Sequence, residues 1–138
     1  LLRESDFIVI TAPSTPETRG MIGERELRLM KPTAYIVNVA RGDIIQEEPL
    51  YRALKEGWIA GAALDVWWPD HWWDPVWFPE GKTPEYPIWE LPNVIATPHN
   101  IASTDTRSDA ELNIIVENIC RIVEGRLPIN QVDKKLQY

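Results

Sequence analysis

The 138-residue chain is poor in cysteine and in basic residues, and both absences narrow its possible functions. Its single cysteine, Cys120, excludes an internal disulfide framework and fits a reducing compartment, so we expect a cytoplasmic protein. The 14 Lys and Arg are scattered, and with 21 Asp and Glu they leave a net charge of −7. Nucleic acids and anionic membranes call for a basic face, and no apolar run approaches the ~20 residues that cross a bilayer, so we expect neither as a partner.

Glycine and histidine are also scarce, which bears on phosphate and metal sites. The seven glycines form neither a G-x-G-x-x-G nor a G-x-x-x-x-G-K pattern, so the sequence holds no recognisable phosphate-cradling loop. The two histidines are not paired at a metal-ligand spacing, and Asp70, His71 and Asp74 make only a weak ligand set. We therefore expect no metal site.

The chain does contain an alternation of apolar runs with helical patterns, which predicts an α/β fold with a parallel sheet flanked by helices. The runs are rich in β-branched or small residues, as in strands buried on both faces. The expected strands are residues 7–12, 34–39, 59–66 and 93–97, and the expected helices are residues 23–31, 47–57 and about 104–125. The last helix carries one apolar stripe, made by Leu112, Ile115, Val116, Ile119, Ile122 and Val123, and we expect Cys120 on the same helix to belong to the core.

A long segment at about residues 67–92 interrupts this alternation. It has no hydrophobic period and contains six prolines, and the stretch 64–78 alone holds five of the seven tryptophans. Long ordered loops in compact domains are usually functional. The tryptophan rings have two interpretations: they wall an active site and exclude water, or they pack beneath the loop or against a second subunit. Because aromatic rings are the usual anchors of packed interfaces, packing is the favoured interpretation.

In open parallel sheets, ligands bind at the carboxyl ends of the strands, which directs attention to the residues that follow each expected strand. These residues are Ala12 and Pro13, Val39 to Arg41, Asp65, and His99. Arg41 either holds a carboxylate through two parallel hydrogen bonds or is a surface arginine in a turn made by Gly42. Asp65 either accepts a hydrogen bond from a ligand amide or caps the loop that follows it.

His99 is the candidate for proton transfer, because imidazole titrates near neutral pH and is the usual general acid or base. The plainer interpretation is a structural histidine. Asp70, in the loop after the third expected strand, could pair with His99, orient its ring and favour its charged form.

Four stretches of the chain together resemble a known family, the D-2-hydroxyacid dehydrogenases, which include phosphoglycerate dehydrogenase, glyoxylate reductase and NAD-dependent formate dehydrogenase. The matching stretches are "SDFIVITAPSTPETRGMIG", "LRLMKPTAYIVNVARGDIIQEEPLYRALKEGWIAGAALDVW", "LPNVIATPHNIAST" and "EGRLPIN". The resemblance implies a Rossmann-like nucleotide-binding domain, NAD as cofactor with NADP not excluded, a small 2-hydroxy or 2-keto acid as substrate, and a homodimer.

The resemblance also implies roles for single residues. Arg41 matches the arginine that binds the substrate carboxylate, and His99 matches the histidine that takes the hydroxyl proton during hydride transfer. Asp65 matches the aspartate that receives the nicotinamide carboxamide. The remaining cofactor contacts fall on Ala12 and Pro13 at the adenine side, and on Val39, Ala40, Ile101 and Ala102 around the nicotinamide.

Two departures from the family pattern stand out. Asp70 occupies the position of the catalytic glutamate, where its side chain is one methylene shorter, a difference of roughly 1.5 Å. The glycine fingerprint and the substrate domain are expected before Leu1, so we expect residues 1–138 to be the second half of an NAD-binding domain. The alternative to an enzyme is a non-catalytic fragment, or a nucleotide-sensing or dimerisation module of the same fold.

Overall fold

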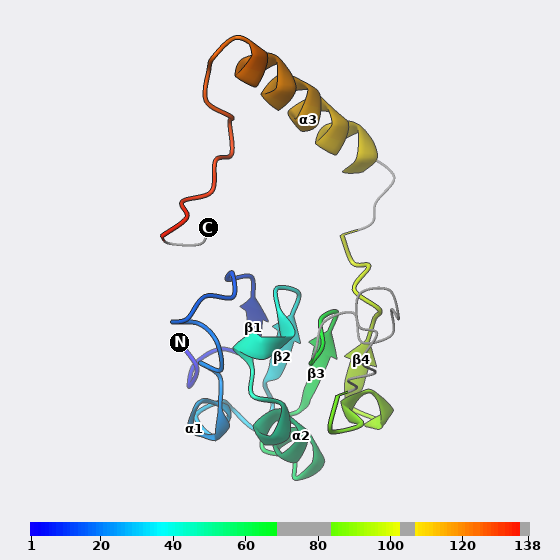
Figure 1. Ribbon diagram of the computed structural model, residues 1–138. Coiled ribbons are helices and arrows are strands. Elements are labelled where there is room, and N and C mark those ends of the chain that lie inside the picture. The colour runs from blue at the N-terminus through cyan, green and yellow to red at the C-terminus, as the bar shows by residue number, and fades with distance from the viewer. Residues whose placement is uncertain (69–83, 103–106, 136–138) are drawn as a thin grey trace. The chain divides into compact units, whose positions relative to one another are not determined.

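The computed structural model describes residues 1–68, 84–102 and 107–135, and its first unit, Leu1–Asn100, is built on a four-stranded sheet. The strands are β1 (Phe7–Ile10), β2 (Tyr35–Asn38), β3 (Gly61–Leu64) and β4 (Val94–Ala96). All neighbours pair in parallel, and the spatial order β1-β2-β3-β4 follows the order in the chain (Figure 1). The predicted α/β fold with a parallel sheet is therefore confirmed.

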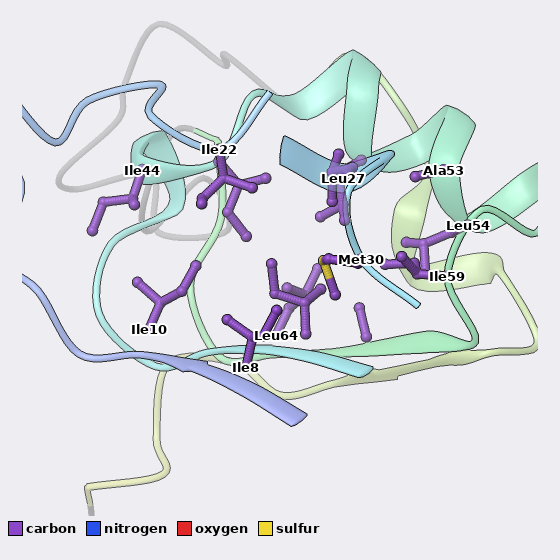
Figure 2. Packing of buried hydrophobic residues seen from close by; sticks show 14 of the residues in the cluster. Ile8, Ile10, Ile22, Leu27, Met30, Ile44, Ala53, Leu54, Ile59 and Leu64 are labelled. Carbon is purple, nitrogen blue, oxygen red and sulfur yellow. The ribbon is translucent and has the colours of Figure 1, made fainter. Parts of the chain in front are cut away.

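Two helices, α1 (Glu24–Leu27) and α2 (Glu47–Lys55), lie on one face of this sheet, and Figure 2 shows the apolar side chains between them. Leu27, Ile36, Leu50 and Leu64 are at most 1% exposed. A fully buried aliphatic side chain of this size contributes about 1.5–3 kcal/mol to folding, so this layer is the main source of stability.

The opposite face of the sheet is more exposed than the sequence predicts. Phe7 and Val9 alternate with the buried Ile8 and Ile10 along β1 and are 68% and 56% exposed. The strands follow one another in order, and right-handed crossovers between such strands place every connecting helix on the same side. The expectation of strands buried on both faces is therefore wrong for β1 in the part of the chain that the structure describes.

Helix α1 is also shorter than the expected helix at residues 23–31. After Leu27 the chain tightens: the Leu29 amide donates to the Glu26 carbonyl and the Met30 amide to the Leu27 carbonyl, both three residues back. Pro32 follows, and a proline disfavours helical backbone in the residue before it. Two short 3₁₀ helices, η1 (Gly42–Ile44) and η2 (Ile88–Glu90), complete the unit.

The second unit, Ile101–Tyr138, contains α3 (Arg107–Val123). Gly125, with a φ of 72°, ends this helix region, and the Asn118 side chain bonds to Ile129 and Asn130 of the following segment. Cys120 is exposed, so its expected place in the core is wrong: the apolar stripe of α3 is itself 52–82% exposed, and no core surrounds this helix among the described residues. No helix among the described residues is long and apolar enough to cross a membrane.

Candidate functional site

The register of the sheet aligns the carboxyl ends of its four strands. Ile10 pairs with Asn38, Asn38 with Leu64, and Leu64 with Ala96. Neighbouring strands lie ~4.8 Å apart, so the segments that follow them leave the sheet side by side. The structure thus brings the residues after β2, β3 and β4, including Arg41, Asp65 and His99, to one edge of the sheet.

The turn that carries Arg41 is held by Asn38, the last residue of β2, which is fully buried. The Asn38 Oδ1 accepts the amide of Ala40 at 3.1 Å, and its Nδ2 donates to the Arg41 carbonyl at 2.9 Å. Arg41 itself is exposed, and its Nη1 donates to the Ala40 carbonyl at 2.7 Å. Within the described residues Arg41 forms no ion pair with an acidic side chain, so no described carboxylate competes with an external anion for its guanidinium.

Asn38 was not among the residues singled out from the sequence. The signal for it is a polar side chain two residues after the inward-facing Ile36, at the last position of β2. A buried amide at such a position must be hydrogen-bonded, and the nearest backbone groups are those of the following turn.

Gly42 brings the segment after β2 into contact with the segment after β3. A Cβ atom on Gly42 would lie 2.0 Å from the Trp67 carbonyl oxygen and 2.5 Å from the Trp67 carbonyl carbon. Both partners are backbone atoms, which cannot turn aside as a side chain can. Only glycine fits at this position, directly after Arg41.

Asp65 caps the turn that carries His99. It is 3% exposed, and its Oδ1 accepts the hydroxyl of Thr97 at 2.5 Å and the amide of Asn100 at 3.0 Å. Between these two anchors His99 adopts a φ of 54°, and no other non-glycine residue in the described segments has a positive φ. The cap formed by these bonds lies on the turn after β4, whereas the sequence interpretation placed it on the loop that follows Asp65; the predicted contact with a cofactor amide stays a prediction.

Two tryptophans after Asp65 pack inward. Trp67 is 5% exposed and packs against the Trp89 ring at 6.1 Å in a T-shaped arrangement, and its Nε1 donates to the Thr97 carbonyl at 3.0 Å. The Trp68 Nε1 donates to the Ile45 carbonyl at 2.7 Å. Packing is therefore confirmed for these two rings. Residues 69–83, which include Asp70 and His71, lie outside the described residues.

The downstream end of the loop is tied to α2 by Glu47. The Tyr86 amide donates to the Glu47 Oε1 at 2.9 Å, and the rings of Tyr51 and Tyr86 are 5.1 Å apart. Partial burial raises the pKa of the Glu47 carboxyl, and the amides of Tyr86 and Glu85 offset part of this effect. Glu47 therefore joins α2 to the loop at Tyr86, although burial makes its ionised form less stable there than in water.

The loops after β1 and β2 meet at Asp43. Its Oδ2 accepts the Ser14 hydroxyl at 2.8 Å and the Arg19 Nε at 2.9 Å. Ala12 and Pro13 lie just before Ser14 and are half-buried and exposed, respectively.

The remaining predicted contacts, Ile101 and Ala102, are exposed and belong to the second unit. Among the described residues, no three His, Cys, Asp or Glu side chains lie close enough together to hold a metal ion.

Residues 1–100 match the NAD-binding domain of the D-isomer specific 2-hydroxyacid dehydrogenases. The chain belongs to this family. The predicted family is confirmed, and its description as an NAD-binding domain agrees with the predicted cofactor.

Curated members of the family are similar in sequence to this chain along nearly its whole length. A glyoxylate reductase of Thermococcus gammatolerans is 43% identical over 99% of this chain, and a D-3-phosphoglycerate dehydrogenase of Methanocaldococcus jannaschii is 43% identical over 96%. The chain spans 37% of the first protein and 23% of the second.

A solved structure has the same fold. It is a D-isomer specific 2-hydroxyacid dehydrogenase from Xanthobacter autotrophicus Py2 in complex with NADPH and MES, with a TM-score of 0.80 and 37% identity. The match covers 99% of this chain and 52% of that one. This likeness confirms the Rossmann-like character of the parallel sheet.

Proposed function

We propose that this chain forms the nicotinamide side of the active site of an NAD(H)-dependent oxidoreductase, which interconverts a small 2-keto acid and the corresponding 2-hydroxy acid. The observation that carries the proposal is the sheet edge, where a guanidinium, a carboxylate and an imidazole follow three neighbouring strands in register. The φ of 54° at His99 supports it, because residues held in sparsely populated backbone conformations cluster at functional sites.

The chemistry at this edge suits the nicotinamide end of the cofactor. When bound, the reduced nicotinamide supplies a hydride to the C2 carbon of the keto acid. Arg41 would bind the substrate carboxylate through two hydrogen bonds and so orient C2. His99, in its protonated form, would donate its proton to the carbonyl oxygen as the alcohol forms, and would take the proton back in the reverse direction. We assign to Asp70 the orientation of the His99 ring.

The cofactor contacts are part of the same proposal. Asp65 would face the nicotinamide carboxamide while its Oδ1 keeps the turn closed. The other proposed contacts are Ala12, Pro13, Val39, Ala40, Ile101 and Ala102. This sequence contains no glycine loop for the cofactor phosphates, so the proposal covers only the nicotinamide and adenine contacts.

The substrate and the choice of dinucleotide follow the relatives. Two of them are named glyoxylate reductase and D-3-phosphoglycerate dehydrogenase, which points to glyoxylate or another short 2-keto acid as the substrate. One solved neighbour is complexed with NADPH and another, from Lactobacillus delbrueckii, with NAD, so both dinucleotides are candidates.

The test compares the substitution of His99 with that of His71, because the chain has only two histidines. The oxidation of NADH and of NADPH is followed by absorbance with glyoxylate and hydroxypyruvate as substrates. The His99→Gln variant should lower kcat by about 10²–10⁴-fold, which is the usual size of a general acid contribution, with little change in the Kd for NADH. The His71→Gln variant is the matched control and should retain activity. Equal activity of the His99→Gln variant and the wild type would exclude the proton-transfer role.

The dimeric state and the cytoplasmic location belong to this proposal as well. The family resemblance supports the first, and the single cysteine supports the second. Sedimentation equilibrium would test the first directly, since a dimer doubles the 15.9 kDa mass of the chain.

A further inference from the structure

We propose that Trp67 is a positioning residue that fixes the His99 turn relative to the Arg41 turn. This inference rests on the proposed function, because it concerns the placement of the groups that would bind the carboxylate and move the proton. Trp67 would act through the backbone segments that carry these side chains, because its contacts at Thr97 and Gly42 are with those segments.

The first link runs from Trp67 to the His99 turn. The indole Nε1 donates to the Thr97 carbonyl at 3.0 Å, and Thr97 precedes His99 by two residues. The same threonine donates its hydroxyl to Asp65, two residues before Trp67. The His99 turn is therefore joined at Thr97 to both a carboxylate and an indole from the segment after β3.

The second link runs from Trp67 to the Arg41 turn. The Trp67 carbonyl lies so close to Gly42 that a Cβ there would meet it at 2.0 Å. Gly42 follows Arg41 directly, and the Arg41 carbonyl is fixed from the other side by the buried Asn38. One residue therefore contacts both turns, its side chain on one and its backbone on the other.

Burial makes this residue rigid enough to serve as a spacer. Trp67 is 5% exposed, belongs to the core cluster and packs edge-to-face against Trp89 of η2. Trp68, the next residue, points its own indole N–H to Ile45, in the segment after β2. The two indoles thus bind segments that follow the strands on either side of β3, Thr97 after β4 and Ile45 after β2. Of these two indoles, that of Trp67 is the one that donates to the segment carrying His99.

The two tryptophans offer a matched pair of variants. Trp67→Phe keeps an aromatic ring in the core and removes the hydrogen bond to Thr97. Trp68→Phe removes a hydrogen bond of the same kind to Ile45. Both variants lose one indole–carbonyl bond, but Trp67→Phe also leaves a cavity in the core, whereas Trp68 is only half-buried, so thermal unfolding should show the larger loss for Trp67→Phe. The readouts below are therefore compared at a temperature at which both variants are fully folded.

The first readout is the NMR signal of the His99 ring in the full chain, in a His71→Gln background that leaves a single imidazole. Trp67→Phe should shift or broaden this signal and the amide signal of Asn100, and Trp68→Phe should leave both in place. An unchanged His99 signal in Trp67→Phe, or the same change in both variants, would overturn the inference. This readout needs no catalytic activity.

The second readout is the division between kcat and KM. Small displacements of reacting groups have large effects on rate, so Trp67→Phe should lower kcat by about tenfold while the KM for NADH stays within about twofold. An unchanged kcat alongside a shifted His99 signal would also refute the positioning role. If the wild-type chain turns over no 2-keto acid, the proposed function fails, and the NMR comparison alone decides the role of Trp67.

Discussion

The contact between Gly42 and Trp67 makes a sharp prediction about one methyl group. In Gly42→Ala the new Cβ would lie 2.0 Å from the Trp67 carbonyl oxygen, whereas ordinary van der Waals contacts lie at 3.4–4 Å. The two backbones would have to separate by more than an ångström. Overpacking a core typically costs 1–3 kcal/mol and occasionally more, so we expect a loss of about 3 kcal/mol in the free energy of unfolding.

Urea unfolding followed by tryptophan fluorescence measures this loss, since the chain contains seven tryptophans. Gly57→Ala serves as the control: Gly57 has a φ of 72°, and a Cβ added there would have no heavy atom within 4 Å, so alanine meets only backbone strain, about 1–2 kcal/mol. Gly42→Ala should be the more destabilised variant, with a Tm lowered by at least about 8 °C. A Gly42→Ala variant no less stable than Gly57→Ala would refute the close approach of these two segments.

Two further predictions concern a carboxylate and an amide. Burial raises the pKa of Glu47 above its ordinary value of 4.5, so ionisation of this group opposes folding as the pH rises from 4.5 through the folded-state pKa. Glu47→Gln should therefore remove this component of the pH dependence of stability and keep or raise the Tm at pH 7. Thermal unfolding measured at several pH values tests this. A large fall in the Tm at pH 7 would show that the ionised carboxylate stabilises the fold, contrary to the direction of the pKa shift. Asn38→Ala should cost about 2–3 kcal/mol in urea unfolding, because it leaves the Ala40 amide and the Arg41 carbonyl without their buried partner; a loss below about 0.5 kcal/mol would show that water replaces the amide.

The parallel sheet could be predicted because its signal is local. Each strand is a short run of β-branched or small apolar residues, and the intervening helix patterns leave a parallel arrangement as the simplest connection. The strand ends then follow from the run ends, which is why Arg41, Asp65 and His99 could be placed at one edge before their contacts were known. Helix α1 was predicted too long, since its apolar pattern continues to Met30 while the backbone already forms bonds to residues three back.

The links between the strand-end turns could not be predicted in the same way. The approach of Gly42 to Trp67 joins two backbones 25 positions apart, and a backbone contact leaves no hydrophobic period in the sequence. Glycine after Arg41 indicated a turn but not the neighbour that requires it. The role of Trp67 could not be predicted either, because the sequence does not distinguish a tryptophan in the core from one that faces a substrate. Its burial, its packing against Trp89 and the bond from its N–H to Thr97 separate the two.

The left-handed backbone at His99 places two opposing demands on one position, because the residue that best suits the backbone is not the one that can transfer a proton. Its φ of 54° suits glycine or asparagine, and a side chain such as histidine is held there at a cost of about 1–2 kcal/mol. Under selection for thermal resistance alone, the turn between Thr97 and Asn100 would drift toward glycine and lose its imidazole. Under selection for turnover, the strained histidine would persist and the Asp65 cap would become harder to replace. The sequences that evolution can sample at this turn are therefore limited by two demands that favour different residues.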